Sequence, residues 1–98
     1  MKFGLAEEEL SLIRSTLALY PMITEVRIFG SRAMGTQRPN SDIDLVLYGD
    51  MTECELGRIH HALDELPLPY QFDLHHAPSI EHEGLRHHIT QWGVKIWP

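Results

Sequence analysis

One polar stretch of the chain combines residue types that suit an anionic ligand. Two glycines five positions apart, Gly30 and Gly35, lie in a short turn that follows the apolar run Val26–Phe29. A second strand-like run, residues 43–48, comes after the turn. Glycine lets the backbone approach a ligand closely, and the backbone N–H groups of such a turn attract phosphate. The turn therefore predicts a phosphate cradle.

Three aspartates supply carboxylates close to this turn. Asp42 and Asp44 stand one residue apart at the start of a strand, so their side chains should point to the same face. Asp73 lies inside a later strand, between the apolar residues Phe72 and Leu74. A buried carboxylate is costly unless it is paired, and a shared divalent cation is one such partner. The pattern predicts magnesium-assisted phosphoryl or nucleotidyl transfer.

Two common nucleotide-binding motifs are excluded by the same stretch. No Gly-Lys-Ser or Gly-Lys-Thr occurs, so the turn is not a Walker A loop. The two glycines are five apart and no third one completes the pattern, which excludes the dinucleotide-binding fingerprint. A Gly-Ser turn alone, or an Asp-x-Asp pair alone, is more often an ordinary turn or a solvated edge. The interpretation depends on their combination with the later aspartate.

Length and charge limit the classes of function that remain. A chain of 98 residues is long enough for one core, so we expect a single domain over 1–98. The net charge of −6, from 8 Lys and Arg against 14 Asp and Glu, argues against a broad basic face for duplex nucleic acid. Cys54 is the only cysteine, which excludes an internal disulfide and a cysteine-rich zinc site. No apolar run approaches the roughly 20 residues that span a bilayer, so we expect a cytoplasmic protein without membrane contact.

Hydrophobic periodicity predicts strands that alternate with helices. Thr52 and Glu55 have the spacing of a capping box at a helix start, and the apolar run 45–47 is typical of a central strand. This alternation indicates an α/β domain with two or three layers. We expect helices over about 6–19, 31–34, 52–66 and 79–91, and strands over 25–29, 42–48, 70–75 and 94–97.

These motifs together resemble a known family. The segment Gly30–Gly35 with Ser41–Leu45 is similar to the signature of the minimal nucleotidyltransferases, the small prokaryotic branch of the DNA polymerase beta-like superfamily. The similarity extends to Asp73 as a third acid and to the ending 85–96, so it covers most of the chain. It implies an α/β fold in which helices flank a small mixed β-sheet. Such proteins are often encoded beside a separate all-helical partner of the HEPN or substrate-binding type, as a toxin and antitoxin or as a two-subunit enzyme.

The resemblance implies a set of residues that bind a nucleoside triphosphate, which we expect to be ATP. Many members have arginine where this chain has Met34, and Arg32 or Arg38 would then supply the missing positive charge. The implied nucleotide-binding residues are Gly30, Ser31, Arg32 and Ser41.

The resemblance also implies a two-metal catalytic site. Asp42 and Asp44 would hold Mg²⁺ ions, with Mn²⁺ as an alternative, and Asp73 would hold one of them and help to activate the attacking hydroxyl. The implied reaction transfers AMP from ATP to a hydroxyl of a protein or another acceptor. The alternative is a non-catalytic antitoxin that neutralises or regulates a helical HEPN-type partner. Both hypotheses predict a hetero-oligomer, and the identities of acceptor and partner stay open at this point.

The histidines and tryptophans need an interpretation beside these motifs. The pairs His60–His61 and His87–His88 fall on predicted helices with polar neighbours, so we expect them at the surface. His75 shares the strand face of Asp73 and is the histidine we expect near the site. The two tryptophans, 92 and 97, are expected to pack within the fold or against a partner.

Overall fold

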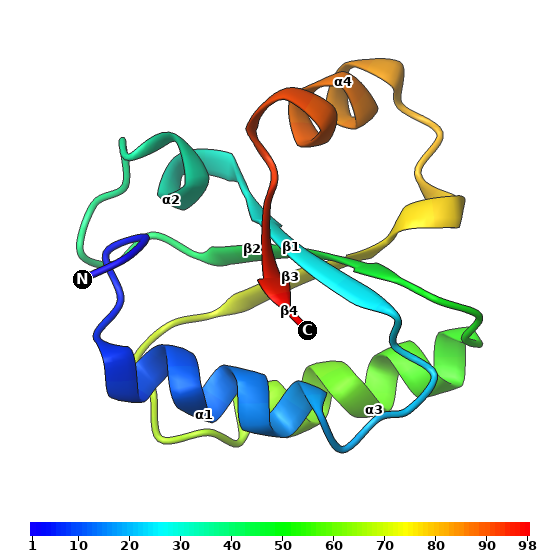
Figure 1. Ribbon diagram of the computed structural model, residues 1–98, viewed down its shortest axis with the longest axis horizontal. Coiled ribbons are helices and arrows are strands. Elements are labelled where there is room, and N and C mark those ends of the chain that lie inside the picture. Colours follow the sequence, from blue (N-terminus) through cyan, green and yellow to red (C-terminus); the bar gives the residue numbers. More distant parts are fainter.

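A four-stranded sheet forms the centre of the computed structural model, which describes residues 1–98 (Figure 1). None of the helices has the length and apolar composition needed to cross a bilayer. The strands are β1 (Glu25–Phe29), β2 (Ile43–Tyr48), β3 (Phe72–His76) and β4 (Val94–Trp97). The helices are α1 (Glu7–Leu17), α2 (Gly30–Met34), α3 (Glu53–Asp64) and α4 (Glu83–Trp92), with a 3₁₀ turn, η1, at Ala77–Ser79.

The sheet is mixed and has the strand order β3-β2-β1-β4. β1 pairs antiparallel with both β2 and β4, whereas β2 and β3 are parallel. A parallel pair needs a crossover connection, which α3 provides. β2 therefore lies inside the sheet, and the predicted central run of Leu45, Val46 and Leu47 is completely buried.

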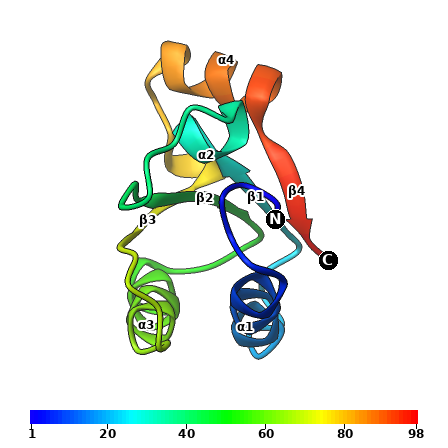
Figure 2. The same cartoon turned by 90° about the vertical axis from the view of Figure 1, so that its left-hand side faces the viewer.

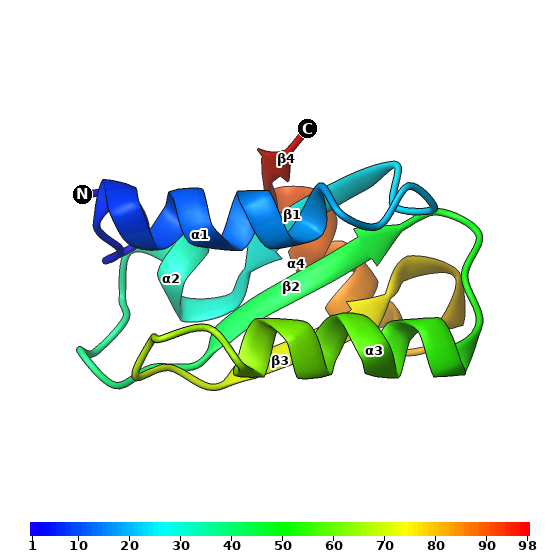
Figure 3. The ribbon, with the colours of Figure 1, turned by 90° about the horizontal axis from the view of Figure 1, so that it is seen from below.

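Helices cover the two faces of the sheet unequally. α1 and α3 lie below one face, whereas α2 and α4 lie on the other (Figure 2); the view from below shows α1 and α3 side by side (Figure 3). A core of 15 buried residues includes side chains of α1, α3 and the sheet. The α4 face is the thinner layer, because its buried cluster has only 4 members: Phe29, Val46, Ile80 and Ile89.

The starts of α3 and α4 differ in how well the sequence predicts them. The capping box of α3 is confirmed, since the Thr52 hydroxyl accepts from the Glu55 N–H at 3.1 Å and the Glu55 carboxylate accepts from the Thr52 N–H at 2.9 Å. α4 begins at Glu83, and the expectation that it begins at Ser79 is wrong. Residues 77–79 form η1 instead, with a proline in its first turn, and His82 caps α4.

A buried arginine fastens the segment that leads into β2. The Arg32 side chain is 2% exposed, and its guanidinium donates hydrogen bonds to the carbonyls of Phe3, Ser41 and Asp42. The bond from Nη2 to the Ser41 oxygen measures 2.7 Å. The guanidinium also lies over the Tyr70 ring, 4.6 Å from its centroid. Because these contacts engage the buried charge, Arg32 holds the loop backbone, and its contact with the nucleotide stays a prediction.

Replacing Arg32 by methionine tests this structural role. The change keeps an unbranched side chain but leaves three carbonyls without their donor. We expect the free energy of unfolding, measured by urea denaturation, to fall by about 3 kcal/mol. Arg38→Met is the matched control, because Arg38 is exposed, and it should cost less than about 0.5 kcal/mol. Equal losses in the two variants would contradict this role.

Candidate functional site

The site is built where β1 passes into α2. Gly30 has a φ of +74°, a conformation that residues with a side chain rarely adopt. A Cβ atom at this position would lie 2.2 Å from Oδ2 of Asp44, so the carboxylate rests directly against the backbone of the turn. Only glycine permits this approach. The predicted cradle glycine therefore also makes room for an aspartate of β2.

The parallel pairing of β2 and β3 places two aspartates next to each other. Asp44 and Asp73 are Cα partners in the register of the two strands. Asp44 alternates in phase with Val46, which belongs to the cluster at α4, so both carboxylates lie on the face covered by α2 and α4. Asp42 is exposed and stands just before β2, which begins at Ile43. The structure therefore brings Asp44 and Asp73 together and leaves Asp42 at the margin.

Burial, with the neighbouring acids, shifts the pKa of Asp44. Burial raises the pKa of this carboxyl from 3.8 to about 6, and the charges of Asp73 and Asp42 contribute to the rise. His75 and His88 lower the same pKa. A negative charge without a counter-ion is thus unfavourable at Asp44, and a bound cation would relieve it.

Asp73 is exposed, contrary to the argument made from its apolar neighbours. Its side chain is 56% exposed, and one carboxylate oxygen lies 3.2 Å from Nε2 of His75. Phe72 and Leu74 point to the opposite face, where they join the core at α3. The apolar neighbours of Asp73 therefore lie on the opposite face of an edge strand. Because Asp73 is not buried, its charge does not require a cation partner.

The carboxylates offer hard oxygen donors without enclosing an ion. No three His, Cys, Asp or Glu side chains converge closely enough to hold a metal. Mg²⁺, however, needs only one or two protein carboxylates, because waters and substrate phosphates complete its shell. The Asp44–Asp73 pair fits that requirement, since its mutual repulsion favours a cation between the two groups. A two-metal arrangement that includes Asp42 stays a prediction.

Two histidines stand near these carboxylates, and both contact the Phe29 ring. His75 lies next to Asp73 and meets Phe29 edge-on at 5.5 Å, close to the site as predicted. His88 of α4 meets the same ring at 6.1 Å and accepts a hydrogen bond from the Gly30 N–H at 3.0 Å. The expectation that His88 is an ordinary surface residue is therefore wrong.

A signal in the sequence could have identified His88. It stands three residues after Leu85 and four before Trp92, on one stripe of the helix. Leu85 packs against the buried cluster of this face, so the stripe faces the sheet. The neighbouring His87 lies outside this spacing and is exposed.

The two serines with an expected nucleotide contact have different surroundings. Ser31 is in the first turn of α2, directly after the cradle glycine and therefore next to the carboxylates. The Ser41 hydroxyl accepts a hydrogen bond from the Arg38 N–H at 2.8 Å and thereby closes the loop before β2. Met34 lies at the far end of α2 and is 41% exposed. Ser31 thus adjoins the cradle glycine, whereas the Ser41 hydroxyl is engaged within the loop.

A comparison with family models decides the classification. Residues 12–98 match the family described as Polymerase beta, Nucleotidyltransferase. The chain belongs to this family. Membership confirms the resemblance read from Gly30–Gly35 and Ser41–Leu45, and the small mixed sheet flanked by helices is the nucleotidyltransferase fold. Among curated proteins, no sequence matches the chain.

Solved structures that share this nucleotidyltransferase fold include toxin–antitoxin complexes. A chain in a crystal structure of a toxin–antitoxin with AMP-PNP is 25% identical, with a TM-score of 0.71 over 95% of this chain and 73% of that chain. A chain in the structure of the tri-AMPylated Shewanella oneidensis HEPN toxin in complex with MNT antitoxin is 18% identical, with a TM-score of 0.70 over 93% of this chain and 71% of that chain. The fold is therefore shared over nearly the whole chain.

The raised pKa of Asp44 predicts how stability depends on pH in the absence of divalent cations. The folded protein keeps the Asp44 proton up to about pH 6, whereas the unfolded chain releases it near 3.8, so the free energy of unfolding falls as pH rises between these values. Thermal melts in a chelator, from about pH 4 to about pH 8, should show that the stability of Asp44→Asn does not fall with pH in this way. At neutral pH the melting temperature of Asp44→Asn should be higher than that of the wild type. Asp50→Asn, at an exposed position, should follow the wild type. Parallel curves for Asp44→Asn and the wild type would contradict the assignment.

The bond between His88 and the Gly30 N–H predicts a difference between two adjacent histidines. His88→Ala removes the acceptor of that N–H and should lower the free energy of unfolding by about 1 kcal/mol or more in urea titrations. His87→Ala is the control, because His87 is exposed, and should have an effect within about 0.5 kcal/mol of zero. A loss as small for His88→Ala as for the control would show that the bond contributes nothing.

Proposed function

We propose that this nucleotidyltransferase transfers AMP from ATP to a hydroxyl on a protein acceptor and requires Mg²⁺, which Mn²⁺ can replace. The observation that carries the proposal is the contact between Gly30 and Asp44, which only the missing Cβ permits. A phosphate bound at the turn would lie within reach of a cation bound at the carboxylate. Nucleotidyl transfer requires such a juxtaposition.

Two of the similar structures support the choice of nucleotide and partner. One toxin–antitoxin structure contains AMP-PNP, and the other contains a tri-AMPylated HEPN toxin with an MNT antitoxin. By analogy we propose ATP as the donor and a small helical HEPN-type protein as the partner, in a cytoplasmic hetero-oligomer. The net charge of −6 suits a basic partner. We further propose that residues 1–98 form one nucleotidyltransferase domain.

Each residue of the site then has a binding task. The Gly30 N–H, Ser31 and Ser41 would receive the triphosphate, while Asp44 and Asp73 would hold one cation between them and Asp42 would complete a two-metal site. The Gly30 N–H donates to His88 in the structure, so this imidazole must release it when a phosphate oxygen arrives. A bound divalent cation neutralises phosphate charge and lowers the pKa of an attacking hydroxyl.

The proposed reaction exchanges one phosphorus–oxygen bond for another. The acceptor hydroxyl oxygen forms a bond to the α-phosphorus, and the bond from that phosphorus to the oxygen bridging to the β-phosphate breaks. The electron pair leaves with pyrophosphate. The hydroxyl proton passes to Asp73, whose carboxylate is exposed on the acceptor side and is oriented by His75.

A transfer assay tests the proposal directly. The purified protein is incubated with the protein encoded beside it, magnesium and each of the four nucleoside triphosphates labelled at the α-phosphate. We expect label from ATP on the acceptor, and a loss of at least about 100-fold with Asp44→Asn. Asp50→Asn, an exposed carboxylate outside the site, should transfer at the wild-type rate. Full transfer by Asp44→Asn, or no transfer from any nucleotide, would refute the proposal.

A second candidate function is a binding module that neutralises its helical partner without catalysis. The observation that favours it is Met34, which is exposed at the end of α2, at a position where the resemblance implies arginine in many members. The doubly substituted chain Asp42→Ala, Asp44→Ala separates the two functions. If the partner is neutralised by AMP transfer, this variant copurifies with the partner but no longer protects cells that express the partner. Full protection by the variant would favour the binding module.

A further inference from the structure

The outer edge of β3 is available to a further strand over part of its length. The Ile43 N–H donates to the Gln71 carbonyl at 2.9 Å, so every second residue from Gln71 turns its backbone groups toward β2. Phe72, Leu74 and His76 therefore turn their backbone groups outward. No strand of the sheet pairs with this edge. Such an edge is a template for an extended segment.

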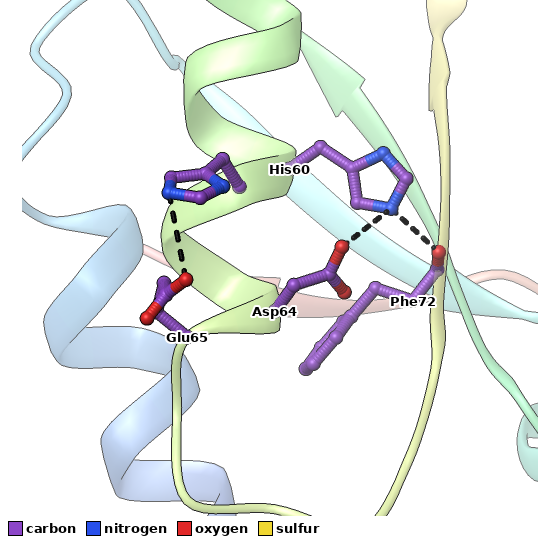
Figure 4. Close-up of polar contacts among 5 residues, drawn as sticks. His60, Asp64, Glu65 and Phe72 are labelled. Carbon is purple, nitrogen blue, oxygen red and sulfur yellow. Dashed lines mark hydrogen bonds and ion pairs between the residues drawn. The ribbon is translucent and has the colours of Figure 1, made fainter.

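A histidine of α3 closes one end of this edge. Nε2 of His60 lies 2.8 Å from the Phe72 carbonyl oxygen and 3.5 Å from the Asp64 carboxylate (Figure 4). His60, expected at the surface, is thus only half exposed and occupies the first outward carbonyl of β3. The neighbouring pair of His61 and Glu65, whose side chains lie 3.5 Å apart, is largely exposed. The part of the edge that remains open begins at Leu74.

A groove of about 470 Å³ follows the open part of the edge. Glu53 and Glu81 line it, together with three histidines, and no Lys or Arg does. A segment with positive charge would therefore be complementary to it. Its apolar lining comes from α3 and the turn before it on one side, from α4 and the segment before it on the other, and from β3 between them: Met51, Leu56, Ile80, Leu85 and Leu74.

The groove is continuous with the acceptor side of the candidate site. His75 belongs to its lining, and the same imidazole lies 3.2 Å from the Asp73 carboxylate. In a sheet, directly opposite residues on neighbouring strands place their side chains on one face about 5 Å apart. A strand added along β3 would therefore set every second side chain on the face that carries Asp73 and His75.

We propose that this groove and the β3 edge bind the protein acceptor as an extended, lysine- or arginine-containing segment that pairs with Leu74 as a fifth strand. The proposal rests on the proposed function and specifies how its acceptor arrives. A hydroxyl residue of the segment lies next to Asp73 on the open face of the sheet. Glu53 and Glu81 contact the basic residues on either side of it.

Amide exchange measured by NMR on the full chain tests the docking without any nucleotide. The probe is a pool of short synthetic peptides with a central hydroxyl residue flanked by lysines, and a pool with glutamates in place of lysines is its control. We expect the lysine pool to slow exchange of the Leu74 amide by at least about tenfold, and the glutamate pool to leave it unchanged. Absence of protection at Leu74, or equal protection by both pools, would overturn the proposal.

Variants identify the groups responsible. Leu74→Pro removes the outward N–H without removing a bond to β2, and Glu81→Lys reverses one charge of the groove. Both should bind the lysine pool about tenfold more weakly, whereas Glu65→Lys, an equal charge change outside the groove, should bind it as the wild type does. If Leu74→Pro does not fold, Glu81→Lys alone tests the docking, and binding of the lysine pool by Glu81→Lys at the wild-type affinity would overturn the proposal.

The peptide experiment uses no ATP, so its result is independent of the transfer assay. Peptide protection without AMP transfer would refute the proposed reaction alone. AMP transfer without peptide protection would refute the docking alone.

Discussion

The close contact between the Gly30 backbone and the Asp44 carboxylate is the constraint on which the site depends. Antiparallel pairing of β1 with β2 sets Phe29 opposite Asp44, so the chain must turn away immediately after Phe29. A positive φ at the next residue makes that turn, and the missing Cβ leaves space for the carboxylate. Parallel pairing with β3 then adds Asp73 beside Asp44. The turn and the adjacent carboxylates of Asp44 and Asp73 thus follow from the pairing of three strands.

Two long-range contacts hold this arrangement from outside the sheet. Arg32 ties the segment before β2 to the N-terminal residues through the Phe3 carbonyl, which fixes the approach of the aspartates to the turn. His88 ties α4 to the turn through the Gly30 N–H. The second contact uses the same donor that a phosphate would use. In the proposed function, nucleotide binding and the position of α4 would therefore be linked by one hydrogen bond.

Local patterns allowed much of the fold to be predicted, because alternation and capping act over a few residues. The central position of β2 and the capping box at Thr52 follow from such patterns, whereas the shared face of Asp44 and Asp73 depends on the parallel pairing of β2 with β3. Alternation shows which residues share a face but not whether anything covers that face, so the exposure of Asp73 was missed. The tasks of Arg32 and His88 depend on partners far away in the sequence, and no local pattern contains them.

A comparison of two glycine variants tests the central constraint most directly. Gly30 and Gly35 both have a positive φ, but a Cβ at Gly35 meets no atom within 4 Å, whereas one at Gly30 meets the Asp44 carboxylate. Alanine therefore brings similar backbone strain to both positions and a steric conflict only to Gly30. Calorimetric titration with magnesium and ATP should show binding weakened about tenfold or more in Gly30→Ala and close to the wild type in Gly35→Ala. Equal affinity in the two variants would contradict the account.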